Sequence, residues 1–149
     1  MKTIIRPCAF GDLPAVQDLM RQLNEFSHND QTFRRDSFER TFALMEKNPD
    51  VYHNVVCERR HIIVGFMALM FYRSFMHQVG SAQINELVVA ESSRGQGIGS
   101  RLIEYAIAEA KARGMDEIEV STEPGNHKAI QFYRKMGFDG EYLLLGMEF

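Results

Sequence analysis

The chain has 149 residues, of which 45% are hydrophobic and 25% are charged, and its formal net charge is −3. A chain of this length can bury a substantial apolar core, and no linker or repeat divides it, so we expect a single domain over residues 1–149. Because acidic and basic residues are interspersed, the basic stripe that general nucleic-acid binding requires is missing, and no nucleic-acid partner is expected.

Neither a membrane span nor a metal site is expected from the sequence. No run of eighteen apolar residues occurs, and the first residues lack the apolar stretch of a signal peptide. The isolated Cys8 and Cys57 indicate neither a disulfide framework nor a zinc cluster, and the five histidines lack metal-ligand spacing. We therefore expect a cytoplasmic protein with no membrane partner and no metal.

The first half of the chain predicts alternating short elements. In order, we expect a strand over residues 2–6, a helix opened by Gly11-Asp12, a helix through Phe38, Phe42 and Met45, and a hairpin of strands 53–58 and 62–71.

The second half predicts two strand–helix units and a final strand. We expect a strand over 81–89, a helix over about 97–113 with Gly114 as its C-cap, a strand over 117–122, a helix over 126–136 ended by Gly137, and a last strand over 141–148.

A glycine-rich stretch between a predicted strand and a predicted helix is the most informative motif. Residues 94–99 read Arg-Gly-Gln-Gly-Ile-Gly, and three glycines leave backbone N–H groups uncovered at a helix N-terminus. Free N–H groups and the positive end of the helix dipole favour a bound phosphate. No Lys-Ser or Lys-Thr pair follows, which excludes a P-loop, and the spacing G-x-G-x-G differs from the dinucleotide fingerprint.

This stretch resembles the R-x-x-G-x-G/A acyl-coenzyme A motif of the GNAT superfamily of N-acetyltransferases, with Arg94, Gly97 and Gly99 at its fixed places. A second motif of that superfamily, N-x-x-A-x-x-F-Y followed by G-F, is similar to residues later in this chain. Its positions are Asn126, Ala129, Phe132, Tyr133 and Gly137-Phe138. The resemblance covers residues 84–138 with specific motifs.

The resemblance implies a fold and a donor substrate. The fold is α/β (α+β), with a mixed, mostly antiparallel sheet of about six to seven strands flanked by four helices. The donor is acetyl-CoA, whose pyrophosphate would meet the backbone N–H groups of residues 96–100 and whose pantetheine arm would pair with the strand at Leu87. The residues expected to contact acetyl-CoA are Leu87, Val88, Val89, Arg94, Gly95, Gln96, Gly97, Ile98, Gly99, Ser100, Asn126, Ala129 and Tyr133.

Two residues are the candidates for catalysis. An alkyl ammonium has a pKa near 10.4 and must lose a proton before it attacks a thioester, and Glu86 is the acid in the central strand that could accept this proton. A solvent-facing Glu86 that only attracts a cation is the alternative. By the resemblance, Tyr133 protonates the departing thiolate; the alternative is a core tyrosine with a satisfied hydroxyl. Asn126 is also placed to cap its helix.

The sequence leaves the acceptor open. The N-terminal half loosely resembles small-amine acetyltransferases for aminoalkylphosphonates and polyamines, and Arg34, Arg35 or Arg73 would serve the phosphonate type. Phe33, Phe38 and Phe42 are candidates for an acceptor-pocket wall. An acetyltransferase of protein N-termini or lysines, and a catalytically silent acyl-CoA-binding module, are the other hypotheses.

A homodimer is a possible partner state. Its candidate contacts are the apolar segments 62–75 and 141–149.

Overall fold

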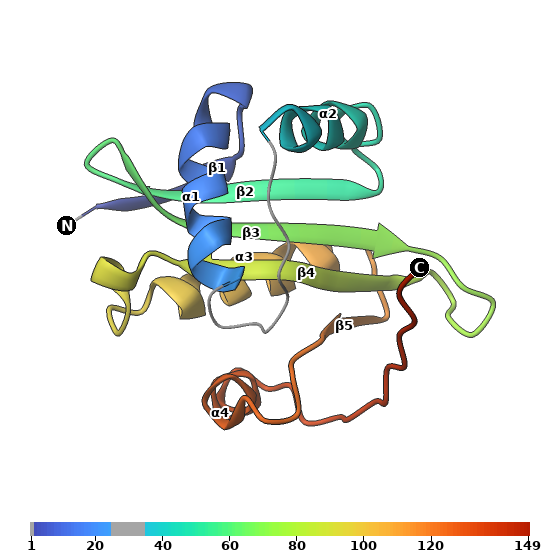
Figure 1. Ribbon diagram of the computed structural model, residues 1–149. Helices are drawn as coiled ribbons and strands as arrows, with labels where there is room; N and C mark the ends of the chain where they lie inside the picture. The colour runs from blue at the N-terminus through green and yellow to red at the C-terminus, as the bar shows by residue number, and fades with distance from the viewer. Residues whose placement is uncertain (1, 25–34) are drawn as a thin grey trace.

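The computed structural model describes residues 2–24 and 35–149. Five strands, four α-helices and two short 3-10 helices make up these ranges (Figure 1). In chain order they are β1 (Thr3–Pro7), η1 (Phe10–Asp12), α1 (Leu13–Asn24), α2 (Arg35–Glu46), β2 (Tyr52–Arg59), β3 (Ile62–Tyr72), β4 (Ser81–Val89), η2 (Glu91–Ser93), α3 (Ile98–Ala112), β5 (Glu117–Val120) and α4 (His127–Lys135).

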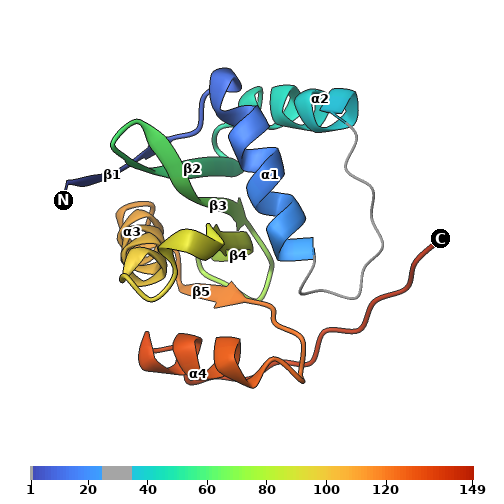
Figure 2. The same ribbon diagram turned by 60° about the vertical axis from the view of Figure 1, so that its left-hand side comes forward.

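The strands form one mixed sheet in the order β1-β2-β3-β4-β5. The first four strands are antiparallel to their neighbours, and β5 joins β4 in parallel. Helices α1 and α2 cover one face of the sheet and α3 covers the other, while α4 lies beyond β5 (Figure 2). The predicted mixed, mostly antiparallel α/β architecture with four helices is confirmed, with five strands in place of the six to seven expected.

Local signals explain where most of these elements begin and end. The predicted hairpin turns at Arg60 and His61, which both have positive φ angles (52° and 62°), as the tightest hairpin turns require. Helix α3 ends before Gly114, whose φ of 70° is the left-handed conformation of a helix C-cap. The predicted C-cap at Gly114 is therefore confirmed.

Each face of the sheet has its own hydrophobic core. On one face, side chains of β2, β3 and β4 pack against the apolar stripe of α3, which includes Leu102, Ile103 and Ala106. On the other face, Val56, Phe66 and other strand residues pack against α1 and α2. Successive residues of a strand point to opposite faces, so a strand buried on both sides contributes to both cores.

The predicted last strand over 141–148 is wrong. Residues 138–149 form no helix or strand, and their large apolar side chains are exposed, with Leu143 86% and Leu145 83% accessible. A strand needs a paired neighbour as well as β-forming residues, and the free edge of β5 is not paired with this segment.

None of the described helices is both long and apolar enough to cross a bilayer.

Candidate active site

The glycine-rich stretch forms an open turn at the start of α3. Gly97 is the N-cap and takes a left-handed conformation, with φ of 78° and ψ of 5°, which favours glycine. No side chain caps this helix, and among the described residues the first helical N–H with a backbone acceptor is that of Arg101, which donates to the Gly97 carbonyl at 3.1 Å. The N–H groups of residues 98–100 are therefore available to an anion.

Polar side chains hold this turn against the end of the sheet. Arg94 donates from Nε to the Val89 carbonyl (3.1 Å), which ties the turn to the last residue of β4. Arg59, at the end of β2, donates from its guanidinium to Gln96 Oε1 (2.5 Å) and to Ser93 Oγ (2.9 Å). Sequence reasoning missed Arg59, because it lies 37 residues before Gln96 and only the fold brings them together.

The third glycine of the motif is required by packing. A Cβ atom built on Gly99 would lie 3.3 Å from Phe132 Cζ, so a side chain there would press on α4. A Cβ atom on Gly97 would meet nothing within 4 Å, because this position faces open space. Gly97 thus serves the backbone of the turn, whereas Gly99 lets the helices that carry the two sequence motifs approach each other.

Strands β4 and β5 diverge beside this turn. Their parallel pairing runs only from Ser81 with Glu117 to Ile84 with Val120, while β4 continues to Val89 paired with β3 alone. Among the described residues, none forms a strand on the β5 side of residues 85–89, as the resemblance implied for the segment beside Leu87. An extended chain with amide groups could complete the ladder along this edge.

A β-bulge sets the direction of Glu86. The β3–β4 register passes from Ala68 with Glu86 to Leu69 with Ile84, so Asn85 is the extra residue in β4. Ile84 belongs to the α3-side core, and a regular strand would place Glu86 on that same face. The extra residue reverses the alternation, and Glu86 points to the α1 and α2 side.

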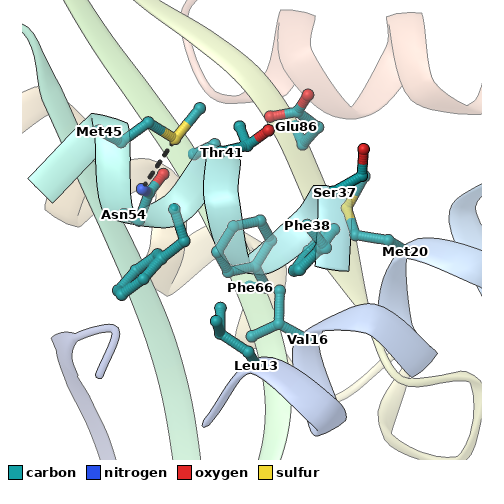
Figure 3. A pocket seen from close by; sticks show the side chains of 12 residues that line it. Leu13, Val16, Met20, Ser37, Phe38, Thr41, Met45, Asn54, Phe66 and Glu86 are labelled. Atoms are coloured by element: carbon teal, nitrogen blue, oxygen red, sulfur yellow. Dashed lines mark hydrogen bonds between the residues drawn. The ribbon is translucent and has the colours of Figure 1, made fainter. Parts of the chain in front are cut away.

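There Glu86 lines a cavity of about 310 Å³ (Figure 3). The cavity lies between α1, α2 and the sheet, and Glu86 is the one ionisable side chain among the described residues that line it. Burial raises the pKa of the Glu86 carboxyl, because desolvation penalises the charged form. The expected wall residues Phe38 and Phe42 line the cavity, while Phe33 lies outside the described residues.

The raised pKa of Glu86 predicts a stability change. An acid with a folded-state pKa above its unfolded value stabilises the fold below the unfolded pKa and loses that contribution as pH rises through the folded pKa. We therefore expect Glu86→Gln to raise Tm by a few degrees near pH 8 and to match the wild type near pH 4. Thermal melts across this range test it; a Tm difference that is constant with pH would contradict it.

Tyr133 lies on the other side of the sheet. It is half-buried, it packs against the α3-side core that includes Leu87 and Val89, and its ring contacts Phe132 and Phe138 at centroid distances of 5.2 and 5.6 Å. Burial raises its pKa to about 12. No hydrogen bond joins its hydroxyl to another described residue, and both roles expected for this tyrosine, proton donor and core residue, stay predictions.

Asn126 caps α4, as expected. Its Oδ1 accepts a hydrogen bond from the backbone N–H of Ala129 at 3.2 Å, which satisfies one free N–H of the first helical turn. This cap fixes where α4 begins and therefore which of its side chains, including Tyr133, face the core.

The comparisons with known proteins agree with this geometry. A model of the Acetyltransferase (GNAT) family matches residues 13–138. The chain belongs to this family. An aminoalkylphosphonate N-acetyltransferase of Salmonella typhimurium is 32% identical to this acetyltransferase over 134 residues, which cover 90% of this chain and 83% of that enzyme. An uncharacterized N-acetyltransferase of Methanocaldococcus jannaschii is 36% identical over 104 residues, covering 69% of this chain but only 45% of that protein.

Solved structures share the fold of this acetyltransferase over its whole length. A transcriptional regulator from Bacillus halodurans has a TM-score of 0.88 and 28% identity, covering 99% of this chain and 100% of that one. A glucosamine-6-phosphate N-acetyltransferase from Arabidopsis thaliana has a TM-score of 0.84 and 19% identity, covering 100% of this chain and 99% of that one. At this identity the likeness supports a shared fold and nothing more. By its family, the chain is an N-acetyltransferase that uses acetyl-CoA.

Proposed function

We propose that the protein transfers an acetyl group from acetyl-CoA to the primary amine of a small molecule, by direct attack in a ternary complex. The observation that carries this proposal is the cavity in which Glu86 is the one ionisable group among the described lining residues. Its volume of about 310 Å³ suits a small acceptor. Glu86 forms no ion pair with another described residue, and an acid of this kind next to the proposed donor site favours turnover over silent acyl-CoA binding.

Two observations support binding of the donor at this site. The uncapped start of α3 offers N–H groups to the pyrophosphate, with Gly97 keeping the approach open. The edge of β4 at residues 85–89 offers backbone groups to the amides of the pantetheine arm. In this proposal Arg94 and Gln96 shape the turn, and Asn126 holds α4 in place beside the arm.

The reaction removes two protons from the nitrogen and adds one to the sulfur. Glu86 accepts the first proton from the ammonium, directly or through a water, and the neutral nitrogen attacks the thioester carbonyl. A C–N bond forms, the C–S bond breaks, and the thiolate receives a proton from the Tyr133 hydroxyl. The second proton that the nitrogen loses as the amide forms passes through solvent and restores the Tyr133 hydroxyl. A panel of amines incubated with acetyl-CoA, with release of the free thiol as the readout, tests the activity.

Binding of CoA at the start of α3 is tested by Gly97→Asp. The new carboxylate would lie beside the pyrophosphate, and we expect CoA to bind about 10- to 100-fold more weakly, since like charges at this distance repel by a few kcal/mol. Gly114→Asp is the matched control, because Gly114 has a similar φ of 70° and open space but lies at the other end of α3. Equal CoA affinity of the two variants in calorimetric titrations would contradict the assignment.

We also propose a cytoplasmic homodimer. The location follows from the cofactor, because coenzyme A is intracellular. The dimer follows from two surfaces that a second copy could cover, the exposed apolar segment 142–149 and the outer edge of β5. Sedimentation at micromolar concentration is expected to show a dimer that Leu144→Asp dissociates. A wild-type protein that sediments as a monomer would refute the dimer.

A further inference from the structure

We propose that the acceptor is a primary amine on an uncharged apolar body, such as an alkylamine or an arylalkylamine, with no phosphate, phosphonate or second ammonium group. This inference rests on the proposed function and names the substrate class of the same cavity. It follows from the composition of the cavity wall and from the position of its one charge.

The wall of the cavity is mainly apolar and comes from both helices and the sheet. Its apolar residues are Leu13, Val16, Met20, Phe38, Phe42, Met45, Phe66 and Ala68. The volume of about 310 Å³ lies at the lower end of the range for ligand sites, which is about 300 to 1,000 Å³. Such a wall gains free energy from each methylene or aromatic ring that it removes from water.

Three of the four polar lining residues lie together at one side of the cavity. Figure 3 shows Glu86 beside Thr41, with Ser37 on the same helix, while Phe66, Leu13 and Val16 lie away from the carboxylate. The remaining polar residue, Asn54, donates its amide to Met45 Sδ at 3.3 Å. An amine bound with its nitrogen at Glu86 therefore extends its body along apolar side chains.

No cationic side chain lines the cavity among the described residues. Arg73, one of the residues expected to serve a phosphonate, donates instead to the Val79 carbonyl of its own loop at 3.2 Å. Arg34 lies outside the described residues, and the side chain of Arg35 is not described. A phosphonate in this cavity would lose its hydration, and Glu86, the one charged side chain of the described wall, would repel it.

A second ammonium is disfavoured for the same reason. A diamine with one nitrogen at Glu86 would bury its other charge among Phe66, Leu13 and Val16, where no second carboxylate is present in the described wall. The acceptor that we propose for this cavity therefore differs from the one named for the Salmonella relative, an aminoalkylphosphonate.

The test compares kcat/KM for matched amines with saturating acetyl-CoA. Along propylamine, butylamine, pentylamine and hexylamine we expect an increase of about fourfold per methylene, the free energy of burying one CH₂. We expect 2-phenylethylamine to match the best of them, and 2-aminoethylphosphonate and 1,6-diaminohexane to fall at least 100-fold below propylamine and hexylamine, respectively. A phosphonate or diamine that equals its apolar partner overturns the substrate class and leaves the proposed function intact. Absence of thiol release with every amine of the panel overturns the proposed function itself.

A pair of variants on α2 shows whether the amine body occupies this cavity. Met45→Ala enlarges the wall and is expected to move the preferred alkylamine to a longer chain, while Leu44→Ala, an exposed neighbour outside the wall, leaves the profile unchanged. Phe38→Ala provides a second enlargement at a half-buried position if Met45→Ala fails to fold. A chain-length profile that neither enlargement alters overturns the proposal.

Discussion

Replacing Tyr133 with phenylalanine is expected to lower kcat by about 10²- to 10⁴-fold, the usual contribution of a general acid, while CoA affinity stays close to that of the wild type. Phenylalanine retains the ring contacts with Phe132 and Phe138 and removes only the hydroxyl. The departing thiolate then has to take its proton from water. Steady-state rates and CoA titrations measured on the same preparation separate the two effects.

Tyr142→Phe is the control for this prediction. Tyr142 is exposed, and its hydroxyl donates to Glu117 at 3.4 Å, far from the start of α3 in the chain. Because burial holds the pKa of Tyr133 at about 12, its hydroxyl stays protonated through the alkaline range, and no loss of rate from its ionisation is expected below about pH 11. Wild-type kcat in Tyr133→Phe would show that the hydroxyl is structural.

Glu86→Gln is expected to lower kcat/KM at neutral pH by about 10²- to 10⁴-fold and to make the rate depend more steeply on pH. Without the carboxylate, turnover relies on amine that is already deprotonated in solution, which increases tenfold per pH unit below the amine pKa. In the wild type, activity should rise as Glu86 ionises, at a pH above the ordinary range of a glutamate because burial raises its pKa.

Rate profiles from pH 6 to 10 distinguish these cases. Glu104→Gln, an exposed position on α3, is the control and should leave the profile unchanged. If Glu86→Gln has the profile of the wild type, another base, or none, serves the amine.

The signals that could be read from the sequence are local. The glycine turn at the start of α3, the cap at Asn126 and the C-cap at Gly114 depend on residues within one helical turn, and the structure places all three as expected. The hairpin of β2 and β3 is equally local, since it depends on two apolar runs around one short turn.

The features that could not be read depend on partners distant in the chain. The bulge at Asn85 exists only in the pairing with β3, so the sequence could not tell which face Glu86 takes. The contact of Arg59 with Gln96 requires the end of β2 to meet the start of α3. The prediction of a last strand is wrong because the apolar residues after Glu141 favour a strand by their β propensity, but no neighbouring strand pairs with them.

The reversal of alternation at Asn85 has a consequence for how such an enzyme diversifies. Glu86 belongs to the cavity under α1 and α2, whereas its neighbour Leu87 belongs to the side of α3. Substitutions of the cavity residues on α1 and α2 therefore act on one face of the sheet, whereas substitutions in the glycine turn act at the start of α3 on the other face. Gln22 of α1 is an exception, because it accepts a hydrogen bond from the Glu91 N–H just before that turn (3.0 Å). Effects at sites that share no contacts are nearly additive. A library confined to the cavity residues of α1 and α2 should exchange one amine for another at almost constant donor affinity, which makes acceptor choice the evolvable part of this fold.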